Sequence, residues 1–388
     1  MSLRIGVGTS ADIDDLVAAS EVIRQARTSL GVPPKAALLY LSTSYDAVAV
    51  VEAVHSNLGG LPLIGCTTGG LMTGGGAHED DAVMLVLLGG DIACTAHLAH
   101  DIARDTYARA HLLAKEAMTA TPEVRMVLLH PEALGVDGGA VVRGVQDAAH
   151  GVMVAGGCAG ELSGRGIPRQ FFGREVLQGA LPLLAIGGDF SVASGRGGGW
   201  QPVGRRYRVT KVEGRAVLEL NDLPVLEVLK DYALTTGIET LVDTPFAVFD
   251  RPGSSEYCLR GVERADATRG ALLFLSGIPL GAELQATLAS VGDVLDGATL
   301  SAATAMREFS GGEPSGALVF SCTARKWILA SRVVDEAARV AAQLAGPTGT
   351  PIQLAGLYNH GEIGPLTTDG PAFLHNQTCV TIVFGTRR

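Results

Sequence analysis

Charged residues are scarce in this chain, and an excess of positive charge is absent. Of 388 residues, 18% are charged, and 30 lysines and arginines stand against 40 aspartates and glutamates, which gives a formal net charge of −10. Nucleic acids and anionic membranes bind concentrated Lys and Arg side chains, and the sequence holds no such cluster. We therefore expect neither nucleic-acid nor membrane binding, and the expected partner is a small molecule or another protein.

Paired cysteines and long apolar runs are also missing. The six cysteines include no Cys-x-x-Cys pair, and the first eight residues hold no apolar stretch of signal-peptide length. The longest apolar runs, such as 82–88, have the length of a strand and not of a bilayer span. We expect a cytoplasmic protein without disulfides. Its 47% hydrophobic content excludes disorder, and its length favours two α/β domains.

Signatures of established catalytic sites are absent as well. We find no Gly-x-Ser-x-Gly elbow, Walker loop, His-Glu-x-x-His motif or clean Gly-x-Gly-x-x-Gly after a strand. An enzyme is therefore less expected than a binding protein. One catalytic alternative stays open, because Cys322 follows an apolar run and could act as a nucleophile if His360 or His375 folded beside it. Packing in the interior is the simpler interpretation of this cysteine.

What the sequence does contain is a recurring pattern of strand, helix, strand and glycine-bearing segment. Residues 36–42 are typical of a strand, residues 47–58 carry apolar side chains at helical spacing, and a second strand at 61–64 runs into Gly-Cys-Thr-Thr-Gly-Gly at 65–70. The same order returns in residues 124–161, where the last segment is Gly-Gly-Cys-Ala-Gly-Glu. We infer an internal duplication of α/β units.

The third copy spans residues 316–365, and a related stretch at 271–295 lacks a convincing glycine turn. In sheets with right-handed crossovers the carboxyl ends of parallel strands gather at one edge, so we expect the three turns to converge there and form a ligand crevice. The alternative is that glycines such as Gly65 and Gly156 merely supply tight turns. The predicted ligand-binding side chains follow from these segments, and they are Cys66, Thr67, Thr68, Cys158, Glu161, Cys322, Arg325, Tyr358, Asn359, His360, Glu362, His375 and Asn376.

The third turn is the richest, because it offers a phenol, an amide, an imidazole and a carboxylate within residues 358–362. Arg325 suits a bidentate contact with a ligand carboxylate, while Thr67, Thr68, Tyr358 and Asn376 suit neutral hydrogen bonds. The residues alone indicate no resident cofactor. If haem binds, His360 or His375 is the expected axial ligand.

A domain boundary is expected near residue 220. A glycine-rich passage at 194–204 leads into a strand-like stretch, and Asn-Asp-Leu-Pro at 221–224 is typical of the start of a helix. We therefore divide the chain into residues 1–220 and 221–388.

Eight short motifs in order resemble the FIST family of two-part sensor proteins over nearly the whole chain. The most specific are Phe-Ser-Cys at 320–322, Gly-Glu-Ile-Gly at 361–364 and His-Asn-Gln-Thr at 375–378; weaker ones lie at 65–70, 156–160, 199–204, 209–214 and 223–226. The resemblance implies a FIST N-terminal-like and a FIST C-terminal-like region, and a role in signal transduction as a small-ligand sensor. It implies an amino acid or derivative as ligand, or, in an alternative, haem-dependent sensing of nitric oxide.

The chain departs from the family pattern in two respects. The first turn continues with Gly-Gly-Leu-Met at 69–72, where relatives more commonly have a Gly-Glu pair. No role for a carboxylate can therefore be transferred to this turn. The second turn does keep a carboxylate, Glu161. The two regions use all the residues, so we expect any output to pass through a separate protein, such as a histidine kinase or a cyclic-di-GMP enzyme.

Overall fold

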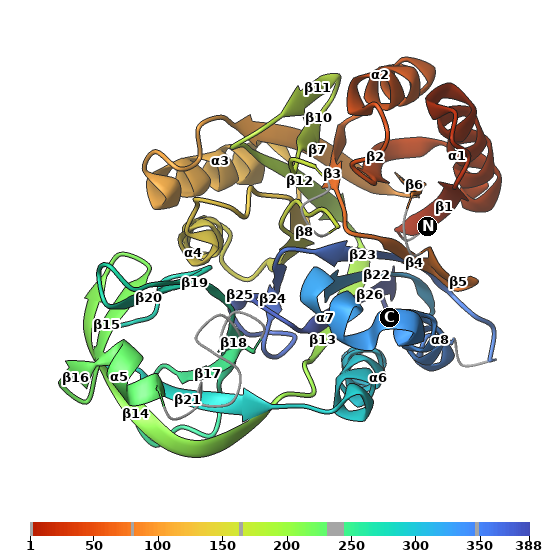
Figure 1. Ribbon diagram of the computed structural model, residues 1–388. Helices are drawn as coiled ribbons and strands as arrows, with labels where there is room; N and C mark the ends of the chain where they lie inside the picture. The colour runs from red at the N-terminus through yellow and green to blue at the C-terminus, as the bar shows by residue number, and fades with distance from the viewer. Residues whose placement is uncertain (1–2, 79–80, 163–165, 231–243, 346–348) are drawn as a thin grey trace.

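The computed structural model describes residues 3–78, 81–162, 166–230, 244–345 and 349–388. Its framework is three α/β units of similar topology and one antiparallel insertion (Figure 1). The first unit consists of β1 (Arg4–Ser10), α1 (Asp15–Leu30), β2 (Pro34–Leu41), α2 (Ala47–Asn57), β3 (Leu63–Thr67), β4 (Leu71–Thr73), β5 (Gly76–His78) and β6 (Val83–Gly89).

The second unit repeats this order of elements. It consists of β7 (Ile92–Ala99), α3 (Thr106–Ala120), β8 (Val124–Leu129), α4 (Gly138–Ala148), β9 (Met153–Gly157), β10 (Gln170–Phe172), β11 (Glu175–Leu177) and β12 (Leu181–Gly188). Aspartates begin three of the helices in these two units, because the side chains of Asp14, Asp46 and Asp137 accept hydrogen bonds from the first free backbone N–H groups of α1, α2 and α4.

The third unit surrounds the insertion. It consists of β13 (Phe190–Gly197), α6 (Val291–Glu308), β22 (Pro314–Cys322), α7 (Thr323–Leu329), the 3-10 helix η2 (Ala330–Arg332), α8 (Val333–Gln343), β23 (Gln353–Asn359), β24 (Glu362–Pro365), β25 (Ala372–His375) and β26 (Cys379–Thr386). The insertion consists of β14 (Gln201–Glu213), β15 (Ala216–Leu220), β16 (Leu223–Pro224), α5 (Val225–Leu229), β17 (Phe246–Phe249), β18 (Cys258–Arg260), β19 (Val262–Asp266), β20 (Ala271–Phe274) and β21 (Glu283–Leu288).

Each unit contributes four strands in equivalent order, β1-β6-β2-β3, β7-β12-β8-β9 and β13-β26-β22-β23, and each sheet is then extended by a hairpin from another unit. The hairpin β4–β5 joins β23 of the third unit, β10–β11 joins β3 of the first, and β24–β25 joins β9 of the second. This cyclic exchange links the three units around a pseudo-threefold axis, with the helices outside (Figure 1).

Alternating side chains explain this layering. In β2, Leu38 and Tyr40 pack into a central core shared by all three units, whereas Leu39 and Leu41 pack under α1 and α2. The register of the parallel pairs makes Tyr40, His130 and Phe320 equivalent, and their rings meet near the axis, with centroids 5.2 Å apart for Tyr40–His130 and 6.3 Å for His130–Phe320.

The predicted α/β class with repeated strand–helix–strand units is confirmed. The related stretch at 271–295 is not such a unit, because its residues form β20, β21 and the start of α6. The predicted glycine turns at 65 and 156 begin inside β3 and β9. A Cβ at Gly65 would lie 1.9 Å from the Leu39 carbonyl oxygen, and one at Gly156 would lie 2.1 Å from that of Leu129, so close strand approach requires both glycines.

The predicted boundary near residue 220 falls at the end of β15, inside the insertion. Strand β13 precedes this point but pairs with β26, which follows it. The division at this residue stays a prediction. The helix expected after residue 224 is present as α5, and Asn221 and Asp222 form the left-handed turn between β15 and β16 with φ of 51° and 63°.

Candidate functional site

The three glycine-bearing segments meet where β3, β9 and β23 end. The amide of Gly69 donates to the carbonyl of Tyr358 at 2.9 Å, and the amide of Gly160 donates to the carbonyl of Thr67 at 2.9 Å. The third link runs through a side chain, because the Asn359 amide nitrogen Nδ2 donates to the carbonyl of Cys158 at 3.1 Å. The predicted convergence of the three segments is therefore present, although a crevice lined by all three stays a prediction.

A cavity of about 210 Å³ opens beside the third segment. Its walls come from the end of β22 and from α7, from the end of β23, from the segment after β25, from the loop before α4 and from the insertion. The lining residues are Leu134, Gly261, Val262, Glu263, Leu275, Cys322, Thr323, Ala324, Trp327, Asn359, His360, Asn376 and Gln377. Four residues that the sequence predicted for the site, Cys322, Asn359, His360 and Asn376, thus share one cavity.

Two buried asparagines in the cavity wall each have one polar atom without a partner. Asn359 is 0% exposed and Asn376 is 1% exposed. Among the described residues, Asn359 Oδ1 and Asn376 Nδ2 have no hydrogen-bond partner. Buried polar atoms are nearly always paired in folded proteins, so two such atoms in one cavity indicate a place for a bound molecule or water.

His360 lies on the wall next to Glu161 of the second segment. Its Nε2 is 3.3 Å from the Glu161 carbonyl oxygen and 3.8 Å from the carboxylate oxygen Oε1. Burial lowers the pKa of His360, and the nearby Glu161 only partly offsets this. The imidazole is therefore neutral at neutral pH.

Behind the cavity lies the fully buried carboxyl group of Glu362. Its Oε2 accepts hydrogen bonds from the Thr378 amide at 3.0 Å and from the Thr378 hydroxyl at 2.8 Å. Burial raises the pKa of Glu362 to about 8, although the Thr378 hydrogen bonds lower it. Burial also raises the pKa of the neighbouring Cys322 thiol, and Glu362 adds to that rise. Both groups are therefore mainly protonated at neutral pH.

The predicted residues of the first two segments, other than Glu161, are internal. Thr68 donates through Oγ1 to the carbonyls of Gly70 at 2.7 Å and Tyr358 at 2.9 Å, and Thr67 Oγ1 accepts from the Arg169 amide at 2.9 Å. Cys66 and Cys158 are buried, and this burial raises the pKa of both thiols. These contacts hold the turns together.

Arg325 and Tyr358 belong to a buried network on the other side of β22. The Arg325 guanidinium pairs with Glu336 of α8 at 2.6 Å, and the Tyr358 hydroxyl donates to the same carboxylate at 2.7 Å. Arg325 also donates to the carbonyls of Gly198 and Val294. Its side chain is 0% exposed, so these partners occupy the group that the sequence assigned to a ligand carboxylate.

The histidines do not fit a haem site. His375 is fully buried, its Nε2 is 2.9 Å from the Gly364 carbonyl oxygen, and it does not line the cavity. His360 does line it, but 210 Å³ lies below the ~300–1,000 Å³ of pockets for drug-sized ligands, and a porphyrin is large among such ligands. Within the described part of the chain, no group of three or more His, Cys, Asp and Glu is placed to hold a metal ion.

Sequence reasoning missed the apolar wall of the cavity. Leu134 and Trp327 are each 50% exposed and stand on it, from the loop before α4 and from α7. Trp327 directly follows the Arg-Lys pair at 325–326 and carried no periodic signal of its own. The wall contributed by the insertion, including Val262 and Leu275, depends on tertiary packing that no local pattern encodes.

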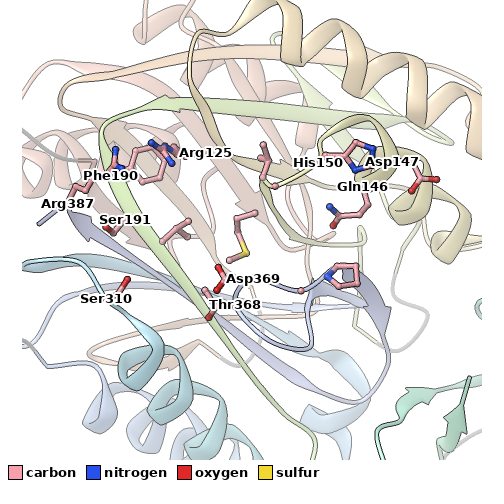
Figure 2. A pocket seen from close by; sticks show the side chains of 16 residues that line it. Arg125, Gln146, Asp147, His150, Phe190, Ser191, Ser310, Thr368, Asp369 and Arg387 are labelled. Atoms are coloured by element: carbon pink, nitrogen blue, oxygen red, sulfur yellow. The ribbon is translucent and has the colours of Figure 1, made fainter. Parts of the chain in front are cut away.

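A larger cavity of about 550 Å³ lies at the opposite ends of the strands, near the starts of β8, β9 and β13. Figure 2 shows Arg125 and Arg387 at one end of it and Asp147 and His150 at the other. None of the predicted site residues lines this cavity. Ligands of open α/β sheets bind outside the carboxyl ends of the strands, so the smaller cavity is the better candidate. None of the described helices is long and apolar enough to cross a membrane.

Comparison with solved structures gives distant likenesses. A cyanuric acid hydrolase from A. caulinodans aligns over 100% of both chains with a TM-score of 0.40 and 11% identity. A chorismatase aligns over 99% of both chains with a TM-score of 0.32 and 11% identity. Likeness at this level says nothing about what this chain binds.

Comparison of sequences is more specific. An uncharacterised protein from Mycobacterium tuberculosis (strain CDC 1551 / Oshkosh) is 29% identical over 398 residues, covering 98% of this chain and 100% of its own. One from Mycobacterium bovis is 27% identical over 415 residues, covering 98% and 99%. The FIST N domain model matches residues 35–223 and the FIST C domain model matches residues 226–365. The chain therefore belongs to the FIST family, whose domains are in general small-ligand sensor domains of signalling proteins.

Proposed function

We propose that this chain is a cytoplasmic sensor that binds a small molecule, an amino acid or a derivative of one, in the cavity lined by Asn359, His360 and Asn376. The observation that carries the proposal is the pair of buried, unpartnered amide atoms in the cavity wall. A pocket with a mainly apolar wall and a few fixed polar groups is the usual form of a small-ligand site.

The position of the cavity supports a sensory role. Its wall combines Leu134 of the second unit, Trp327 and Asn359 of the third unit, and Val262 of the insertion. A ligand that contacts all of these parts favours the arrangement of the parts that it binds more tightly. It shifts the equilibrium between two arrangements by the difference in its affinity for them. We expect a separate signalling protein, such as a histidine kinase or a cyclic-di-GMP enzyme, to recognise that arrangement.

An enzyme that uses Cys322 is less well supported. Nucleophilic cysteines react as thiolates and have lowered pKa values, whereas burial raises the pKa of Cys322. The carboxyl group of Glu362 lies beside this thiol and raises the pKa of Cys322 further. The local electrostatics thus oppose the thiolate.

A ligand screen with two matched variants tests the proposal. Ala324 lines the cavity and Ser310 lines the larger cavity at the opposite strand ends. We expect amino acids or their derivatives to raise the unfolding temperature of the wild type and of Ser310→Phe, and not of Ala324→Phe, in which the phenyl ring fills the smaller cavity. An equal thermal shift in Ala324→Phe would exclude this cavity as the site.

A further inference from the structure

The unpartnered atoms of the two asparagines have fixed and opposite hydrogen-bonding character. Asn359 Nδ2 donates to the Cys158 carbonyl at 3.1 Å, so its oxygen is the atom left free. Asn376 Oδ1 accepts from the Gly261 amide at 3.0 Å, so its nitrogen is the atom left free. If the Asn359 amide were flipped, its oxygen would lie against the Cys158 carbonyl oxygen, so that two acceptors would meet. If the Asn376 amide were flipped, its nitrogen would lie against the Gly261 N–H, so that two donors would meet. The two asparagines therefore leave one acceptor and one donor in the wall of the cavity.

The cavity offers no positive charge. Among the residues that the structure describes, its lining includes no lysine or arginine, and its ionisable members are Cys322, Glu263 and His360. Glu263 is paired with Arg215 at 2.6 Å, and the imidazole of His360 is neutral because burial lowers its pKa. A ligand carboxylate in this cavity would lose its hydration without gaining a cationic partner, which is unfavourable.

The apolar part of the wall is formed by Leu134, Val262, Leu275, Ala324 and Trp327. The geometry points to a ligand that presents an uncharged amide group, whose N–H donates to Asn359 Oδ1 and whose C=O accepts from Asn376 Nδ2, on a small apolar body. Lactams, primary carboxamides, including those derived from amino acids, and cyclic ureides belong to this class. This inference rests on the proposed function, because it names the ligand class of the same cavity.

Two pairs of probes test the two properties of the proposed ligand class, which are the amide N–H group and the absence of charge. δ-Valerolactam and cyclohexanone are six-membered rings with the same carbonyl group, and only the lactam has an N–H group. Isovaleramide and isovalerate share a carbon skeleton, and only the second is an anion. Trp327 lines the cavity and is one of two tryptophans, so the full-length Trp200→Phe variant reports binding through Trp327 fluorescence.

We expect each amide to bind roughly tenfold or more tightly than its partner, because the partner leaves a buried polar atom or a charge unsatisfied. In Asn376→Asp, the oxygen that accepts from Gly261 is kept and the free donor becomes an acceptor. This substitution should weaken the binding of δ-valerolactam and of cyclohexanone alike, because both present a carbonyl group to Asn376, and it should leave in place the preference for the lactam, which depends on Asn359. Asn376→Leu, which removes the donor without adding charge, should have the same effect, and the unfolding temperature of each variant shows that it is folded.

The outcomes separate the ligand class from the function. Binding of isovalerate or cyclohexanone as tight as that of the amides overturns the amide class, and so does a panel in which no amide binds. If an amino acid binds instead and Ala324→Phe abolishes that binding, the sensor site stands and only the ligand class fails. If ligands bind equally to Ala324→Phe, the proposed function fails as well.

Discussion

Glu362 carries a carboxyl group that the fold holds away from water, directly behind the candidate cavity. Its ordinary pKa of 4.5 rises to about 8 because burial penalises the charged form. The folded state therefore keeps a proton that the unfolded state loses. The contribution of this carboxyl group to the free energy of unfolding is therefore at its full value below about pH 4.5, and it decreases as the pH rises toward about 8.

The first prediction concerns Glu362→Gln, which keeps the shape of the side chain and removes its titration. Between pH 5 and pH 8.5, the free energy of unfolding of the variant should increase relative to that of the wild type. The increase should be about 1.4 kcal/mol per pH unit in the range between the unfolded-state pKa of 4.5 and the folded-state pKa of about 8. Chemical denaturation across this range measures it. A difference that stays constant with pH would show that Glu362 titrates normally.

A second prediction concerns Arg325, whose guanidinium is paired with Glu336 and is 0% exposed. Arg325→Ala should lower the free energy of unfolding by about 3–5 kcal/mol, because it leaves a buried carboxylate unpaired. Arg332→Ala is the control, since its exposed pair with Asp335 is worth about 0–1 kcal/mol. If Arg325→Ala unfolded like the wild type and lost only the binding of a carboxylate ligand, the direct ligand role predicted from the sequence would be correct.

These residues show what a sequence can and cannot indicate at this scale. The density of polar side chains after an apolar strand drew attention to Asn359, His360 and Asn376, and these three residues share a cavity. The same density also drew attention to Arg325 and Tyr358. Their common partner Glu336 lies on α8, and the spacing along the chain carries no information about that contact.

At the scale of elements, the strand ends that build the site depend on glycines at which the backbones of two neighbouring strands come close together. Gly65 of β3 and Gly156 of β9 face the carbonyl oxygens of Leu39 and Leu129. At the equivalent position of the third unit, a Cβ added to Gly356 would instead lie 2.1 Å from Cγ of the Met72 side chain. A flexible side chain can move, whereas a backbone in a sheet cannot.

We therefore predict that Gly65→Ala and Gly156→Ala destabilise the protein more than Gly356→Ala does. The first two should cost roughly 3 kcal/mol or more, and the third should lie within the ~1–3 kcal/mol typical of overpacking. Gly74→Ala is the control, because nothing lies within 4 Å of its Cβ position. Unfolding temperatures of the four variants give the order, and a Gly65→Ala variant as stable as Gly74→Ala would contradict it.

Periodicity was enough to predict one strand–helix–strand stretch in each unit, β2–α2–β3, β8–α4–β9 and β22–α8–β23, because apolar spacing is a local property. It did not indicate where the hairpins β4–β5, β10–β11 and β24–β25 go, since each joins a sheet of another unit. It also suggested a related unit at 271–295, where residues 283–288 form the strand β21 of the insertion. Pairing between distant segments is decided by tertiary packing, which short apolar runs do not specify.

At the scale of the whole molecule, the exchanged hairpins make the three units interdependent. A chain cut at residue 220 would separate β13 from β26 and would separate β9 from β24. We predict that residues 1–220 and 221–388 expressed separately do not fold, and that together they form a complex with native-like circular dichroism. Two fragments that each unfold cooperatively alone would instead establish the boundary as one between independent domains.

The proposed site for a small molecule lies between Asn359 and Asn376, in the cavity beside the third segment. A crystal structure of the full chain with δ-valerolactam, or with the ligand that the thermal screen identifies, tests it most directly. We expect ligand density in that cavity, with polar atoms at hydrogen-bond distance from Asn359 Oδ1 and Asn376 Nδ2. Ligand density only in the cavity of Figure 2, or elsewhere on the molecule, would contradict it.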